Sequence, residues 1–162
     1  MARAQSAGVV LFRRRKAGIE VLLVHPGGPF WTRKDAGAWS IPKGEFAPDE
    51  TPEAAARREF GEETGIALTI DLVALSPVTQ SHAKTVHPFA GESDLDPATI
   101  RSNQFELEWP PRSGRMQTFP EIDRAAWFTL DQARTKIVAG QRPILDELER
   151  RLTVGPTSAS EQ

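Results

Sequence analysis

The hydrophobic positions along this chain fall mostly into short runs in which apolar and polar residues alternate. Alternation with a period of two is typical of β-strands that bury one face, and several of these runs are rich in β-branched residues. Segments with Gly and Pro interrupt the runs and predict loops. The pattern predicts strands over residues 7–13, 19–25, 67–78, 81–89, 105–109 and 124–128, and a short extended piece over 39–42.

Residues 52–64 have the features of a helix instead. Thr51 is a suitable N-cap, and Pro52 fits the first helical position, where its missing N–H leaves no hydrogen bond unmade. Consecutive alanines favour the helix, and Gly65 can end it in a left-handed conformation. The segment therefore predicts a capped helix with a narrow apolar face that includes Phe60.

The last part of the chain predicts two more helices, over 130–139 and 142–152, with Gly140 between them as a stop signal. Strands interspersed with helices indicate an α/β fold. The length suits a single domain, which we expect over residues 5–152. The end of the chain, 153–162, is rich in Ser, Thr, Gly and Pro and predicts a flexible tail.

Composition and charge limit the classes of function. The formal net charge is −2, so the chain has no overall attraction to nucleic acid or anionic membranes, and any phosphate binding must be local. The absence of cysteine excludes disulfides, thiolate metal sites and cysteine nucleophiles. No apolar run approaches the roughly 20 residues that a membrane-spanning helix needs. We expect a cytoplasmic protein.

Three glutamates give the clearest chemical signal. Glu59, Glu62 and Glu63 are spaced i, i+3 and i+4 in the predicted helix, so their side chains share one face. Like charges this close destabilise a helix, which favours a role in which a cation neutralises them. Hard divalent ions such as Mg²⁺ prefer carboxylate oxygens and keep waters that substrate phosphates can replace. The spacing indicates a metal-phosphate site.

The segment around these glutamates resembles the Nudix box, G-x5-E-x7-R-E-U-x-E-E-x-G-U, where U is a bulky apolar residue. A solvated acidic face is the alternative for an isolated E-x-x-E-E, but it does not account for the complete pattern. The only departure is mild, because a Phe stands where an aliphatic residue is more usual. The nine specified positions are Gly44, Glu50, Arg58, Glu59, Phe60, Glu62, Glu63, Gly65 and Ile66.

The resemblance implies the fold and the reaction of that family. It implies an α/β/α sandwich with a mixed sheet, in which the box forms a catalytic loop–helix–loop. Members of the family cleave a nucleoside diphosphate linked to another group, by attack of water on phosphorus. Phosphoryl transfer asks a protein mainly to position groups and to neutralise charge. The resemblance therefore implies a pyrophosphohydrolase that uses Mg²⁺ or Mn²⁺.

The same resemblance implies roles for individual residues. Glu59, Glu62 and Glu63 are expected to ligate the metal ion together with the carbonyl of Gly44, and Glu59 is the first candidate to take a proton from water. Arg58 is expected to orient a box carboxylate through a charge-assisted hydrogen bond. A later acid is the rival proton acceptor or an additional ligand, and four candidates stay open: Glu106, Glu108, Glu121 and Asp123.

Three residues outside the metal ligands are candidates for substrate binding. Lys43 and Lys84 offer positive charge to phosphates, and Trp31 can stack on a base, as aromatic side chains do with nucleotides. Each also has a structural interpretation, as surface charge or as a half-buried aromatic residue. The three histidines match no zinc spacing, which favours core or surface positions for them.

The substrate is the least determined property. Residues 39–45, WSIPKGE, resemble the lead-in of family members that hydrolyse nucleoside and dinucleoside polyphosphates. We expect such a small nucleotide as the substrate, bound by a monomer or a homodimer, without nucleic acid or membrane. Two alternatives stay open. One is removal of pyrophosphate from RNA 5′ ends, and the other is a non-catalytic Nudix domain that senses a ligand.

Overall fold

The computed structural model describes the backbone of residues 3–160 and the side chains of residues 3–153. Its helices are α1 (Pro52–Thr64), α2 (Leu130–Lys136) and α3 (Arg142–Ser160), with short 3₁₀ turns η1 (Pro97–Thr99) and η2 (Ala139–Gln141). Its strands are β1 (Ala4–Arg15), β2 (Gly18–Pro26), β3 (Lys43–Glu45), β4 (Val73–Ala74), β5 (Val78–Ser81), β6 (Lys84–Glu92), β7 (Gln104–Glu108), β8 (Met116–Pro120) and β9 (Ile122–Thr129).

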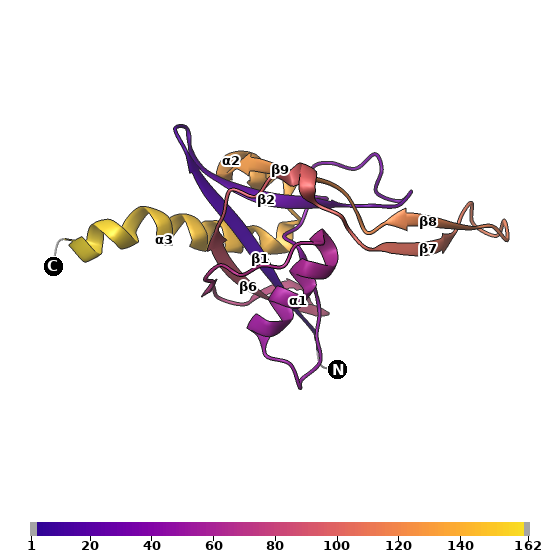
Figure 1. The fold of residues 1–162 in the computed structure, drawn as a ribbon, viewed down its shortest axis with the longest axis horizontal. Helices are drawn as coiled ribbons and strands as arrows, with labels where there is room; N and C mark the ends of the chain where they lie inside the picture. Colours follow the sequence, from indigo (N-terminus) through magenta and orange to yellow (C-terminus); the bar gives the residue numbers. More distant parts are fainter. Residues whose placement is uncertain (1–2, 161–162) are drawn as a thin grey trace.

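Seven of these strands form one mixed sheet (Figure 1). β1 lies parallel to β6 and antiparallel to β2, and β9 continues the sheet beyond β2. β4 and β5 pair with β6. The first half of β1 also pairs with β3, from Ser6 opposite Glu45 to Gly8 opposite Lys43. The sheet therefore places the first residues of the box next to the central strand.

Alternating side chains on β1 give the sheet two buried faces. Val10 packs in one core with Leu145 and Leu148 of α3. Val9 points to the opposite side and packs in a second core with Phe60 of α1. Helices thus cover both faces of a mixed sheet, and the predicted α/β/α arrangement is confirmed.

The box helix forms as its sequence predicts. Thr51 caps the start of α1, and its hydroxyl accepts a hydrogen bond from the Ala54 amide at 3.2 Å. Gly65 ends the helix in the left-handed conformation, with φ of 75°. The caps fix the length of α1, and its buried side holds it against the sheet, so the carboxylates that it carries have a defined position. The buried residues are Ala55, Ala56, Phe60 and Thr64.

The strands predicted over 7–13, 19–25, 105–109 and 124–128 are confirmed as β1, β2, β7 and β9. The long strand predicted over 67–78 is wrong, because only β4 and the first residue of β5 fall within it, and β6 begins three residues later than predicted, at Lys84. The alternation itself is real, since Leu68, Ile70 and Leu72 pack against the α1 core. Their backbone lies outside the sheet.

Three features at the ends of the fold were not predicted. β8 pairs with β7 in a separate two-stranded sheet that extends away from the main body (Figure 1). α2 ends at Lys136, three residues early, and is followed by η2. α3 runs to Ser160, beyond the predicted helix end at 152, and residues 161–162 of the predicted tail lie outside the described residues. Within residues 3–160, no helix is long and apolar enough to cross a membrane.

Candidate active site

Gly44 and Glu59 come together because α1 packs against β3. A Cβ atom on Gly44 would lie only 1.9 Å from Oε1 of Glu59. The Glu59 carboxylate therefore occupies the space that any larger residue at position 44 would fill. Gly44 does not have a positive φ, so the requirement for glycine here comes from this close approach and not from the backbone conformation.

Arg58 ties the carboxylates of the box together. Its guanidinium donates two hydrogen bonds of 2.8 Å to Glu50, which form a bidentate pair. Its remaining terminal nitrogen donates to Glu59 at 2.7 Å and to Glu62 at 3.1 Å. A bidentate arginine–carboxylate pair fixes direction as well as distance. Arg58 thus holds three carboxylates in one arrangement.

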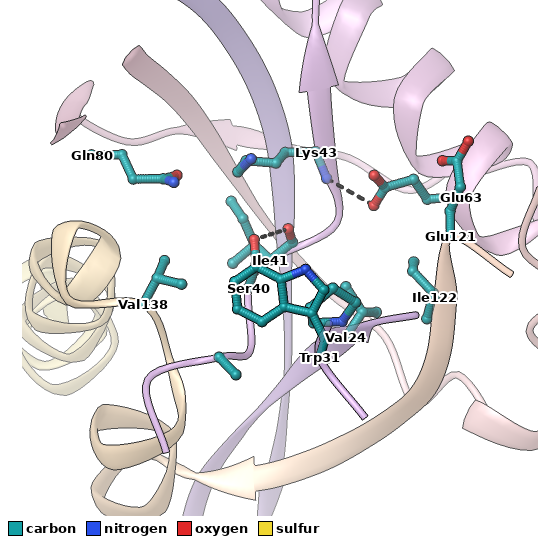
Figure 2. A pocket seen from close by; sticks show the side chains of 12 residues that line it. Val24, Trp31, Ser40, Ile41, Lys43, Glu63, Gln80, Glu121, Ile122 and Val138 are labelled. Carbon is teal, nitrogen blue, oxygen red and sulfur yellow. Dashed lines mark hydrogen bonds between the residues drawn. The ribbon is translucent and has the colours of Figure 1, made fainter. Parts of the chain in front are cut away.

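Glu63 lies on the pocket side of the box (Figure 2). Its Oε1 accepts a hydrogen bond from the Lys43 backbone amide at 3.2 Å. Burial raises the pKa of Glu63 to about 8, although that hydrogen bond and the charge of Lys43 oppose the shift. Burial also raises the pKa of Glu59, against the hydrogen bond from Arg58. For both Glu59 and Glu63, the favourable interactions do not fully offset the cost of burying the charged form. An added cation would therefore stabilise both as carboxylates.

The donor set of the box fits a hard divalent cation. Carboxylate oxygens are the preferred ligands of Mg²⁺, and two of these carboxyl groups are partly removed from water. In their present positions, no three acidic or histidine side chains within the described residues enclose a metal site. Glu59 and Glu62 instead meet Arg58. The ligands expected from the sequence are these two side chains, Glu63 and the Gly44 carbonyl, and to hold a metal ion the two side chains would have to exchange their present hydrogen bonds with Arg58.

A pocket of about 240 Å³ lies beside the box. Glu63 and Glu121 line one side of it, and Gln80 and Val138 line the other (Figure 2). The side chain of Lys43 extends between the two sides, toward Gln80 (Figure 2). Pockets for whole drug-sized ligands have volumes of roughly 300–1,000 Å³. This one suits a single part of a nucleotide.

Two of the three candidates for substrate binding line this pocket. Trp31 is 38% exposed, and the Lys34 amine lies 5.1 Å from the centre of its ring. Lys43 is half-buried, and burial together with the charge of Lys84 lowers the pKa of Lys43. Lys84 is close enough for its charge to act on Lys43, but it lies at the start of β6, outside the pocket lining.

Of the four later acids, the fold brings one to the box. Glu121 lines the pocket, and its charge contributes to the raised pKa values of two box glutamates. Oδ1 of Asp123 lies 2.8 Å from Nδ1 of the buried His25, so Asp123 belongs to a structural pair. Glu106 and Glu108 are exposed on β7, in the hairpin that extends away from the body.

Four residues of the pocket region gave no separate signal in the sequence. Ser40, Gln80 and Val138 line the pocket. Gln141 is fully buried and donates hydrogen bonds of 3.0 Å to both Ser40 and Gln80. These residues belong to β5, to the segment before β3 and to the region around η2, so only the tertiary structure assembles them.

The sequence matches the family model of the NUDIX domain over residues 2–148. A MutT-like protein of Streptomyces ambofaciens is 49% identical over 39 residues, which cover 24% of this chain and 25% of that protein. An RNA pyrophosphohydrolase of Erythrobacter litoralis is 44% identical over 45 residues, which cover 27% of each. The chain thus spans about a quarter of the length of the curated relatives that it matches.

The fold also occurs in solved structures. The crystal structure of a C. elegans Ap4A hydrolase binary complex matches with a TM-score of 0.59 and 21% identity, and the match covers 93% of this chain and 98% of that chain. At this level of identity, the likeness establishes the common fold alone. The family model extends over most of the chain and includes the whole box. The chain therefore belongs to the NUDIX domain family.

Proposed function

We propose that this protein hydrolyses a diphosphate linkage in a nucleoside or dinucleoside polyphosphate, with Mg²⁺ or Mn²⁺ as cofactor. One observation carries the proposal. Glu63 and Glu121 line the same pocket as Lys43, so acids suited to a metal ion face a cation suited to a phosphate. Family membership supports the same chemistry. The cytoplasmic location and the monomeric or homodimeric state stay predictions.

The box residues form the metal-binding half of this proposal. Glu59, Glu62 and Glu63, with the carbonyl of Gly44, would hold the ion, and a bound ion would supply polarisation of the phosphate oxygens. Arg58 sets the directions of two of these carboxylates through its bonds of 2.7 and 3.1 Å. Arg58 also forms the bidentate pair with Glu50, which would keep its guanidinium in place if Glu59 and Glu62 turned to a metal ion.

Lys43 and Trp31 form the substrate-binding half. Burial disfavours the charged form of Lys43, and a phosphate group beside it would offset that penalty. Lys84 adds a second positive charge nearby, suited to a chain of several phosphates. Trp31 lines the pocket with its ring partly exposed, as stacking on a base requires.

We assign the proton acceptor to Glu121 rather than to Glu59, the first candidate from the sequence. Glu59 is bonded to Arg58 and lies against Gly44. Glu121 is an exposed residue that lines the pocket, so water reaches it there. A carboxylate with these properties can take the proton from a water molecule as its oxygen attacks phosphorus.

The test of the proposed function is a substrate panel assayed with Mg²⁺. The panel contains diadenosine polyphosphates, nucleoside triphosphates, ADP-ribose, NADH and nucleotide sugars, with phosphate release and product chromatography as readouts. We expect turnover of at least one nucleotide and its loss in Glu62→Gln. No turnover on any member of the panel would overturn the proposal, and binding without turnover would favour the ligand sensor.

The proton acceptor is tested by Glu121→Gln, with Glu106→Gln as the matched control. The first variant should lower kcat by about 10²- to 10⁴-fold with little change in KM. The control removes the same charge from the exposed hairpin and should leave kcat unchanged. If Glu121→Gln keeps its activity while Glu59→Gln loses it, the role returns to Glu59.

The match to the RNA pyrophosphohydrolase of Erythrobacter litoralis favours a second candidate, removal of pyrophosphate from RNA 5′ ends. Trp31 lines the pocket with its ring 38% exposed, so an aromatic ring there is available to an unpaired base. An RNA oligonucleotide with a 5′-triphosphate, added to the same assay, distinguishes the two candidates. Faster turnover of this RNA than of any free nucleotide would favour the second.

A further inference from the structure

Gln141 is a fully buried polar side chain that connects three residues of the pocket wall. Its side-chain oxygen accepts a hydrogen bond from the Ile41 backbone amide at 3.1 Å. Its side-chain nitrogen donates to Oγ of Ser40 and to Oε1 of Gln80, each at 3.0 Å. The amide of Gln141 therefore sets the direction of the polar groups that it meets.

The chain of hydrogen bonds fixes which edge of Gln80 faces the pocket. A backbone N–H can only donate, so the atom of Gln141 that meets Ile41 must be its oxygen. The nitrogen of Gln141 then faces Gln80, whose partner atom must be an oxygen. The amide nitrogen of Gln80 is left for other partners, and Gln80 lines the pocket. Gln80 consequently presents N–H donors there.

The neighbouring polar side chains add no free hydrogen-bond acceptor at this end of the pocket. The hydroxyl of Ser40 donates to the Ile41 carbonyl at 2.7 Å and accepts from Gln141, so its proton is already used (Figure 2). The amine of Lys43, which extends toward Gln80, is also a donor (Figure 2). The polar side chains at this end of the pocket therefore call for a hydrogen-bond acceptor.

Close backbone packing holds Gln80 and Gln141 in fixed positions relative to each other. η2 carries Gln141 and lies against β5, which carries Gln80. A Cβ atom on Gly140 would lie 2.2 Å from the Gln80 carbonyl oxygen. Contact this close resists sliding of one element past the other. A polar group held rigidly in a site is what allows the site to reject a ligand of the wrong polarity.

We propose that this end of the pocket binds a nucleobase and selects one that presents a carbonyl oxygen to Gln80, such as a 6-oxopurine, over one that presents an amino group. The inference rests on the proposed function, because it names the base of the nucleotide substrate. Ile41 and Val138 provide apolar walls and Trp31 provides an aromatic ring, which suit a base better than a charged phosphate. An amino group in this position would face Gln80 donor to donor, and both groups would stay unpaired.

Binding of IMP and AMP to the full chain tests the inference without turnover. The two nucleotides carry the same ribose and phosphate and differ in the carbonyl or amino group of the purine. By NMR titration, we expect IMP to bind about ten-fold more tightly than AMP. Equal affinity, or tighter binding of AMP, would overturn the inference.

Gln80→Met identifies the residue responsible. Methionine has a similar length and no N–H donor, so IMP should bind about ten-fold more weakly while the affinity for AMP stays the same. Gln104→Met is the control, because it makes the same change at an exposed position on β7. Equal losses for IMP, AMP and inorganic phosphate in Gln80→Met would show a phosphate contact instead, and would overturn the inference. Gln80 is only half-buried, so this variant should fold.

Turnover of ITP and ATP with Mg²⁺ separates this inference from the proposed function. We expect kcat/KM to be about ten-fold higher for ITP in the wild type and equal for the two in Gln80→Met. Tighter binding of IMP without turnover of any nucleotide would contradict the proposed function and support the base selectivity. Turnover with equal kcat/KM for ITP and ATP would support the proposed function and overturn the base selectivity.

Discussion

Replacing Gly44 with alanine should remove activity while leaving the fold intact. The new Cβ atom would lie 1.9 Å from Oε1 and 2.1 Å from Cδ of Glu59. Non-bonded heavy atoms prefer separations of about 3.5 Å, so the carboxylate must move by more than about 1 Å. The φ angle of Gly44 is not positive, so alanine meets no backbone strain there. The displaced group is the end of a flexible side chain, which can move without the backbone.

The expected effects on rate and on stability differ in size. A misplacement of about 1 Å in an active site lowers the rate by about 10²-fold, so we expect kcat to fall by at least that factor. The stability loss is limited to the hydrogen bond between Glu59 and Arg58, about 1 kcal/mol. For a chain of this size, this corresponds to a decrease in Tm of roughly 2–4 °C. Damage to the site and unfolding can therefore be told apart.

Gly61→Ala is the matched control, because it makes the same chemical change within the box. A Cβ atom there would have one neighbour, the Ile66 carbonyl oxygen at 3.7 Å, which is an ordinary contact. Alanine is favoured over glycine in a helix interior by roughly 1 kcal/mol, so Tm should rise and kcat should stay unchanged. Phosphate release with saturating nucleotide measures kcat, and circular dichroism measures Tm. Full activity of Gly44→Ala, or equal losses in both variants, would refute the reasoning.

Two further predictions concern stability. Phe60→Ala should lower the free energy of unfolding by about 3–5 kcal/mol in chemical denaturation, because the ring is fully buried between α1 and the sheet; a loss below about 1 kcal/mol would contradict this packing. Burial acts to raise the pKa of Glu147, but hydrogen bonds from the Ser76 amide and from Arg151 outweigh it and lower that pKa. The stability that this carboxylate provides is present above the unfolded-state pKa, 4.5, and is lost as pH falls through the folded-state value. Wild type should therefore be more stable than Glu147→Gln at about pH 6.5, with the difference closing as the pH falls below 4.5; a difference independent of pH would contradict the assignment.

The box half of the site was predictable because its determinants are local. The spacing of Glu59, Glu62 and Glu63 on one helix depends only on the helical period, and Thr51 and Gly65 mark its ends. Both caps form as predicted. What the spacing could not supply is the direction of each side chain, which depends on tertiary contacts with the strand before the helix.

The predicted strand over 67–78 shows what alternation cannot determine. Ile66, Leu68, Ile70 and Leu72 do turn one face to the α1 core. A period of two reports which side chains are buried, whereas a strand also needs a neighbour for its backbone hydrogen bonds. In this segment the chain crosses over the core, and only β4 and Val78 join the sheet. β8 shows the converse, because it pairs with β7 although its own residues do not alternate between buried and exposed.

The two ends of the pocket are assembled differently, and this has a consequence for selectivity. The box carboxylates come from one helix, whereas Trp31, Gln80 and Gln141 come from separate parts of the chain. Changes in groups without shared contacts usually have additive effects. A substitution of a box carboxylate should therefore lower kcat for ITP and for ATP by the same factor. Gln80→Met should change only the ratio of kcat/KM between ITP and ATP. If each variant altered both the rate and the preference between ITP and ATP, the base and the phosphates would not be recognised independently. The box carboxylates would then have to move together with the pocket wall around Gln80.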